Sequence, residues 1–153
     1  MRLDLNLLDF ADRLVIETRD AGRVIFDPVR KRKMVLTPEE LVRQLLVQYL
    51  IGEKEYPLAR FRVEKGLKVN TRLKRCDILI YDRQAQPYII VECKSAKVEI
   101  NDTVFEQIAR YNITLRVPIL IVSNGIATYC CKINLQEKTW AFLKDIPFFD
   151  VKI

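Results

Sequence analysis

The chain has 153 residues, of which 50% are hydrophobic, and it carries a formal net charge of +6. This length suits a single domain with one sizeable hydrophobic core. The chain contains no histidine, so histidine-dependent nucleophiles and histidine metal sites are excluded. Any catalysis must use carboxylates, lysines, amides or hydroxyls.

Several other features are missing from the sequence. The N-terminus mixes charged residues with leucines, unlike a signal peptide, and no apolar run reaches the roughly 18 residues of a membrane span. Without a G-x-x-x-x-G-K-[ST] motif, the chain cannot be an NTP-driven motor. The four cysteines form no C-x-x-C pair and are expected to be reduced thiols. We therefore expect a soluble, cytoplasmic protein without a membrane partner.

The positive charge is concentrated in two blocks. The first closes an N-terminal region, residues 1–34, that is predicted to add short strands ahead of the core, and the second surrounds a predicted turn. The blocks are Arg30, Lys31, Arg32 and Lys33, and then Lys65, Lys68, Arg72, Lys74 and Arg75. Such a run is either a solvated face or a site for a polyanion, and the net positive charge suits the second interpretation without proving it.

The segment 37–52 is predicted to be a helix. Thr37 can act as the N-cap, Pro38 suits the first helical position, and Gly52 ends the segment. Apolar residues recur along it as a wide stripe that must pack against another element. At about 100° per residue, Glu39 lies on the flank of this stripe and Glu40 lies nearly opposite it. Glu39 is therefore predicted to point inward.

Beyond this helix the pattern predicts strands on both sides of a second helix. That helix spans about 102–115, with Thr103 and Glu106 spaced as a capping box, and a tight turn is predicted at 124–125. The predicted strands are 59–63, 76–81, 88–94, 118–123 and 126–133. This order predicts an α/β fold in which helices pack on a mixed central β-sheet.

Segment 82–87 is predicted to be the hairpin turn between the second and third of these strands. If its centre falls between Gln84 and Ala85, Asp77 faces Glu92 directly, with Cβ atoms about 4.5–5.5 Å apart. Two carboxylates about 5 Å apart repel by roughly 3 kcal/mol at an effective dielectric near 20. The pair therefore needs a cation.

Two cations could meet this need. Lys94 shares a face with Glu92, because side chains two apart in a strand point the same way, and the result could be an ordinary surface charge cluster. The alternative is Mg²⁺, held by Asp77 and Glu92 with Glu39 as a third carboxylate. Lys94 would then orient or deprotonate an attacking water, which suits phosphodiester hydrolysis without histidine.

Asp77 followed by Glu92-Cys93-Lys94 resembles the signature of the PD-(D/E)XK nuclease superfamily, although Cys76 stands where the superfamily name has proline. A nearer likeness covers Asp27 to Gly125. Five segments in this range resemble, in order, the N-terminal nuclease domain of type I restriction enzyme R subunits. They read DPVRKRKMVLTPEELVRQ, RCDILIYD, PYIIVECKS, QIARY and LIVSNG.

This resemblance implies a restriction-endonuclease-like core and a DNA endonuclease that depends on Mg²⁺, with Mn²⁺ as a substitute. The implied metal ligands are Asp77, Glu92 and Glu39, with Glu40 as a rival for the last role. The implied catalytic residues are Asp77, Glu92, Lys94, Gln107 and Tyr111, the last two from the family's Gln-x-x-x-Tyr motif.

The expected partner is DNA, held along its phosphate backbone by basic side chains. The residues predicted to contact it are Arg30, Lys31, Arg32, Lys33, Arg43, Lys74 and Arg75. Two alternatives remain open, namely a non-catalytic nucleic-acid- or protein-binding module on a nuclease scaffold, and an interaction domain with no nucleic-acid role. A homodimer would suit cleavage of both strands.

The expected organisation is one domain, 1–153, with an N-terminal extension at 1–34, a core with the motifs at 35–125 and C-terminal strands at 126–153. The chain stops near the point where the family's ATP-driven motor begins. We therefore expect a domain that acts alone, works beside a separate motor or restriction-system subunit, or keeps the fold without regulated cleavage.

Overall fold

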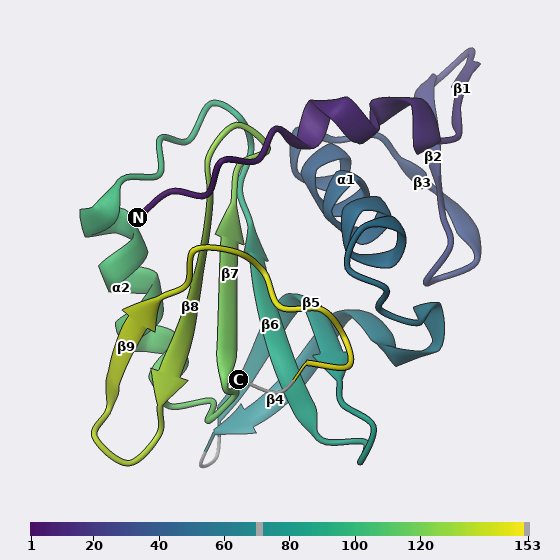
Figure 1. Cartoon of the computed structure of the whole chain (residues 1–153). Helices are drawn as coiled ribbons and strands as arrows, with labels where there is room; N and C mark the ends of the chain where they lie inside the picture. The colour runs from purple at the N-terminus through teal and green to yellow at the C-terminus, as the bar shows by residue number, and fades with distance from the viewer. Residues whose placement is uncertain (70–71, 152–153) are drawn as a thin grey trace.

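The computed structural model describes residues 1–69 and 72–151, with side chains for all of these except 68–69 and 72–74. Within this part of the chain, the main sheet has six strands in the order β4-β5-β6-β7-β8-β9 (Figure 1). They are β4 (Phe61–Val69), β5 (Arg72–Tyr81), β6 (Pro87–Cys93), β7 (Ile119–Ser123), β8 (Thr128–Asn134) and β9 (Thr139–Phe142). Only β6 and β7 pair in parallel among these described strands, so the predicted mixed sheet is confirmed.

Helix α1 (Pro38–Gly52) begins and ends where the sequence predicts. The Thr37 hydroxyl accepts a hydrogen bond from the backbone N–H of Glu40 at 3.1 Å, which satisfies one of the unpaired donors of the first turn. Leu45, Leu46 and Leu50 of α1 are fully buried in a core cluster with alternate residues of the sheet, such as Ile89. This packing covers one face of the sheet.

Helix α2 (Asp102–Ile113) covers the opposite face. Its Phe105 packs in a second core cluster with Ile90, the strand neighbour of Ile89, and successive strand residues point to opposite faces. The predicted capping box of Thr103 and Glu106 is wrong. Asn101 caps the helix instead, since its side-chain oxygen accepts a hydrogen bond from the backbone N–H of Val104 at 3.0 Å.

The N-terminal region forms its own antiparallel sheet of β1 (Ile16–Arg19), β2 (Gly22–Asp27) and β3 (Arg32–Val35), preceded by a 3₁₀-helix η1 (Leu7–Arg13). The short strands predicted there are confirmed. Figure 1 shows α1 lying between this sheet and the main sheet. As a consequence, α1 is covered on two sides rather than one.

The β5–β6 hairpin has the predicted register. Ile78 pairs with Val91, Leu79 with Ile90 and Ile80 with Ile89, and the register shifts only nearer the turn. This alignment brings the stretch of β5 that contains Asp77 beside the end of β6 that contains Glu92.

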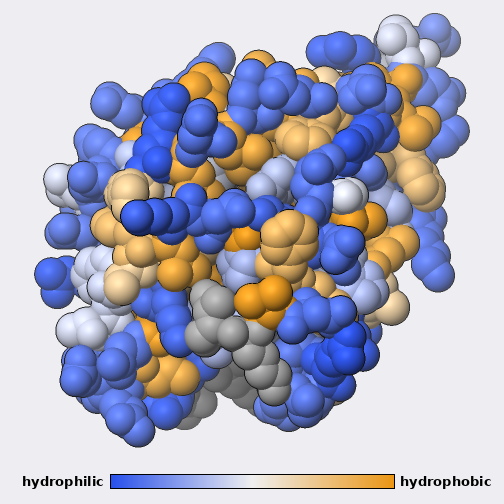
Figure 2. Space-filling view, in the orientation of Figure 1, coloured by the Kyte–Doolittle hydropathy of each residue, from blue (hydrophilic) through white to orange (hydrophobic). Residues whose placement is uncertain are grey.

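After β9 the chain crosses back over the sheet as a C-terminal segment (143–151), which the sequence did not predict (Figure 1). Among the contacts that hold it, the Tyr56 hydroxyl donates to the Pro147 carbonyl at 2.8 Å, and the Lys54 ammonium donates to the Asp145 carboxylate at 2.6 Å. Figure 2 shows a surface on this side that is mostly hydrophilic, with scattered apolar residues. None of the described helices is long and apolar enough to cross a membrane.

Candidate active site

The end of β6 carries the acidic and basic residues of the predicted motif. Glu92 pairs with Val122 in the parallel ladder to β7, and the backbone N–H of Lys94 donates to the Ser123 carbonyl at 2.8 Å, one residue beyond the strand. Pairing with β7 therefore fixes the backbone at both Glu92 and Lys94. Glu92 lies two residues after Ile90, whose side chain faces α2, so Glu92 points to the α2 side.

A pocket of about 310 Å³ opens at this point between β6 and α2. Its lining includes Glu92 and Lys94 from the end of β6, Gln107 and Tyr111 from α2, and Arg75 from β5. Gln107 and Tyr111 lie one turn apart on the same flank of the helix, as their spacing predicts. Five residues predicted to be functional thus meet in one place.

Asp77 reaches the same strand end from β5 but contacts the other helix. Its Oδ2 accepts a hydrogen bond from the backbone N–H of Cys93 at 2.7 Å, and its Oδ1 lies 3.6 Å from Nη2 of Arg43 on α1. Asp77 is not part of the pocket lining. Asp77 is therefore held beside Arg43 of α1 and the backbone of Cys93, while Glu92, the residue before Cys93, lines the pocket toward α2.

Glu40, rather than Glu39, points inward, and the prediction for Glu39 is wrong. Glu39 is exposed, whereas Glu40 is only 6% exposed. Its Oε1 accepts from Arg30 at 2.5 Å and from Arg43 at 3.2 Å, while its Oε2 accepts from Gln44 at 3.1 Å. Within the described residues, no three acidic or thiol groups gather closely enough to hold a metal ion, so the triad with Glu39 is not assembled.

The ion pairs around Glu40 form one network that spans both sheets. Asp27, fully buried at the end of β2, pairs with Arg30 and accepts the backbone N–H of Val29 at 2.8 Å. Burial acts to lower the pKa of Arg30, but hydrogen bonds to Asp27 and Glu40 outweigh it, so the pKa is raised. Arg30 is therefore locked in its charged form by two carboxylates.

Glu64 is a member of this network that the sequence analysis missed. Its Oε2 lies 3.5 Å from Arg30 and its Oε1 lies 3.8 Å from Arg43. Its φ angle is 55°, although it lies inside β4, opposite the position of Asp77. A strand pattern cannot reveal such a conformation, which is rare for residues other than glycine.

The residues predicted to bind DNA divide into two groups. Lys31, Arg32, Lys33 and Arg75 are exposed. Arg30 and Arg43 are instead held in the ion-pair network, with side chains 12% and 8% exposed. These two guanidinium groups are therefore paired with carboxylates inside the protein, and their contact with DNA stays a prediction. The side chain of Lys74 lies outside the described residues.

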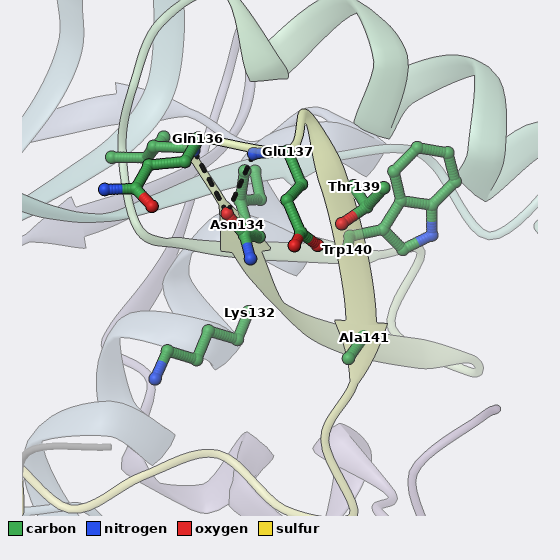
Figure 3. A pocket seen from close by; sticks show the side chains of 9 residues that line it. Lys132, Asn134, Gln136, Glu137, Thr139, Trp140 and Ala141 are labelled. Atoms are coloured by element: carbon green, nitrogen blue, oxygen red, sulfur yellow. Dashed lines mark hydrogen bonds between the residues drawn. The ribbon is translucent and has the colours of Figure 1, made fainter.

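A second hollow, of about 640 Å³, lies along the β8–β9 hairpin (Figure 3). None of the residues predicted to be functional lines it. Its Asn134 side chain accepts the backbone N–H groups of Gln136 and Glu137, both at 3.0 Å, and so serves the turn itself. We therefore place the candidate site at the end of β6 and not here.

Comparison with known protein families shows the family to which the chain belongs. Residues 38–147 match the family described as the type I restriction enzyme R protein N terminus. The chain belongs to this family. A comparison with curated proteins finds no match.

The residues that match the type I restriction enzyme R protein N terminus include most of the candidate site. Asp77, Glu92, Lys94, Gln107 and Tyr111 all lie inside the matched range. The resemblance noted from the five sequence segments is thereby confirmed, and it sets the chain in the context of restriction–modification. Asp27 and Arg30 lie outside the match, so one of the three side-chain hydrogen bonds to the Glu40 carboxylate comes from the N-terminal region.

All four cysteines of the domain are reduced and buried, as predicted. Burial raises the pKa of the Cys93 thiol well above its ordinary value, with the charge of Asp77 adding to the shift, and burial raises the pKa of Cys131 to about 12. Burial also raises the pKa of Cys130. These thiols therefore carry no thiolate near neutral pH.

We expect the native thiols to be inert to an aromatic disulfide reagent at pH 8 and to react fully in guanidinium. In the unfolded chain they ionise near pH 8.5, so the unfolded state loses protons first, and stability should fall as the pH rises above about 8.5. Absorbance of the released thiolate and denaturant midpoints at pH 7 and pH 10 measure both effects. Rapid modification of the native protein would contradict the prediction.

Proposed function

We propose that this domain is a Mg²⁺-dependent endonuclease that hydrolyses DNA phosphodiester bonds. The observation that carries the proposal is the pocket at the end of β6, where Glu92 and Lys94 meet Gln107, Tyr111 and Arg75. A carboxylate, an ammonium group and a guanidinium around one opening suit a substrate whose reacting group is a phosphate. The family membership supports the same reaction class.

The residues present fit a magnesium ion in their chemistry. Asp77 and Glu92 flank Cys93 and offer oxygen ligands, which Mg²⁺ prefers, and one or two carboxylates with waters and phosphates commonly suffice. Bound there, the metal would polarise the phosphate and lower the pKa of a water. Mn²⁺ would serve as a substitute.

The side chains of the pocket have distinct roles in this proposal. Lys94, fixed by the bond of its backbone to β7, orients the attacking water or takes its proton, and it balances charge that grows on the phosphate. Gln107 can hydrogen-bond the water or a phosphate oxygen. Arg75 binds the phosphate backbone, because a guanidinium matches two phosphate oxygens at once.

The exposed basic residues Lys31, Arg32 and Lys33 are proposed as separate DNA contacts, which would be salt-sensitive and independent of sequence. The family context makes another subunit of a restriction system, including one that carries a motor, a candidate partner. A second copy of the chain would supply the second active site that cleavage of both strands requires.

The proposal is tested with supercoiled plasmid, Mg²⁺ or Mn²⁺, and the wild-type chain beside Asp77→Asn. We expect nicking that EDTA stops and that Asp77→Asn abolishes, while Asp20→Asn, an exposed turn residue, cleaves at the wild-type rate. Asparagine keeps an oxygen for the Cys93 N–H, so folding should survive. Equal behaviour of the wild type and Asp77→Asn would end the enzymatic proposal.

Two observations favour a non-catalytic binding module as the second candidate. Arg43 pairs with Asp77, and no three-ligand group is found among the described side chains. Such a module would retain DNA in a salt-dependent way, with no effect of divalent ions. Filter binding with EDTA or Mg²⁺ separates the two candidates, because only the nuclease couples metal to Asp77.

A further inference from the structure

One terminal nitrogen of the Arg43 side chain makes a hydrogen bond, and the other lies between two carboxylates. Its Nη1 bonds Glu40 at 3.2 Å. Its Nη2 lies 3.6 Å from Asp77 and 3.8 Å from Glu64, distances of ion pairs that are longer than hydrogen bonds. Nη2 therefore has an ion pair with each of the two carboxylates but a hydrogen bond with neither.

The backbone of Glu64 is unusual for its position in β4. Val63 pairs with Ile78 and Lys65 with Cys76, so Glu64 lies opposite Asp77, and its φ angle of 55° is disfavoured for any residue with a Cβ. A disfavoured conformation persists only when the surrounding structure holds it, and such residues cluster at functional sites. Here it leaves the Glu64 carboxylate beside Arg30 and Arg43.

The charge of the network also matters. Counted as ionised, the carboxylates of Asp27, Glu40, Glu64 and Asp77 exceed the guanidinium groups of Arg30 and Arg43 by two. A divalent cation at Asp77 would offset this excess. The same cation would repel Arg43, because both positive groups need the same carboxylate.

We propose that Arg43 is a positioning residue that holds Asp77 until a divalent cation binds, and that Glu64 then takes over Nη2 of Arg43. This inference rests on the proposed function, since it requires Asp77 to bind the metal. Glu64 acts through Arg43 and not as a ligand. Removing the carboxylate of Glu64 leaves Arg43 Nη2 without its alternative partner among the described side chains, so the arginine competes harder for Asp77 and metal binding weakens.

The test measures Mn²⁺ binding to the full chain by the electron paramagnetic resonance signal of unbound Mn²⁺, a readout independent of cleavage. Glu64→Gln should weaken binding about fivefold or more, the range typical of coupling between sites. Glu137→Gln removes one charge from an exposed position far along the sequence and is the matched control, with a change below about twofold.

The decisive comparison repeats Glu64→Gln in an Arg43→Gln background. If Glu64 acts only through Arg43, the second substitution should then change the Mn²⁺ affinity less than about twofold. Equal weakening in both backgrounds would make Glu64 a direct ligand and overturn the inference. If Arg43→Gln does not fold, Arg43→Lys replaces it, because lysine keeps a charge but cannot bridge Glu40 and a second carboxylate.

Failure of the inference and failure of the proposed function are distinguishable. If Asp77→Asn abolishes Mn²⁺ binding while Glu64→Gln has no effect, the nuclease proposal stands and the role of Glu64 falls. If Asp77→Asn binds Mn²⁺ as the wild type does, or the wild type binds none, both fall. Circular dichroism of each variant confirms that the fold is present in every comparison.

Discussion

Replacing Lys94 by alanine is expected to slow DNA cleavage by about 10²–10⁴-fold, the usual contribution of a positioned acid–base group. The reason is its location: Lys94 lines the pocket with Glu92 and Gln107, and its backbone is fixed by Ser123. DNA retention should change little, because the loss of one lysine removes only one phosphate contact. Single-turnover cleavage of plasmid and filter binding, at one salt concentration, measure the two effects.

Lys97 provides the matched control for this experiment. It is an exposed lysine three residues further along, and it does not line the pocket. Lys97→Ala removes the same charge from the same region, so it should retain at least half of the wild-type rate. Equal rate losses in both variants would mean that only the electrostatic attraction to DNA had been measured, and would remove Lys94 from the proposed mechanism.

Replacing Glu40 by alanine is expected to lower the free energy of unfolding by about 3–5 kcal/mol. The cost arises because Arg30 and Arg43 would lose a shared carboxylate in the protein interior, where their side chains are 12% and 8% exposed. Losses of this size are a large fraction of the stability of an ordinary domain. Urea unfolding, followed by the single tryptophan, measures the change.

The preceding residue, Glu39, is the matched control for the Glu40 substitution. Glu39 and Glu40 both lie in the first turn of α1, so each interacts favourably with the helix dipole. Glu39 is exposed, and Glu39→Ala should cost less than about 1 kcal/mol. Equal losses for the two variants would show that the helix dipole, rather than the ion-pair network, accounts for the effect of Glu40.

Local physics in the sequence determined helix α1 and the register of the β5–β6 hairpin. Helix α1 follows from a capping threonine, a proline at the first position and an apolar stripe, all within one segment. The pairing of Ile78 with Val91 follows from the centre of a short turn, because the turn fixes which residues of the two strands face each other. Glu92, Lys94 and Gln107 then meet in one pocket once α2 packs on the face of the sheet toward which Glu92 points.

The orientation of the acidic side chains was decided only by the tertiary structure. Helical periodicity places Glu40 nearly opposite the apolar stripe of α1, but the N-terminal sheet lies on that side and Arg30, from the turn between β2 and β3, bonds Glu40 (Figure 1). Asp77 likewise engages Arg43, from an element distant in sequence, rather than facing Glu92 alone. Periodicity identifies which side of a helix packs most strongly, whereas burial of a charge depends on counter-ions that distant segments supply.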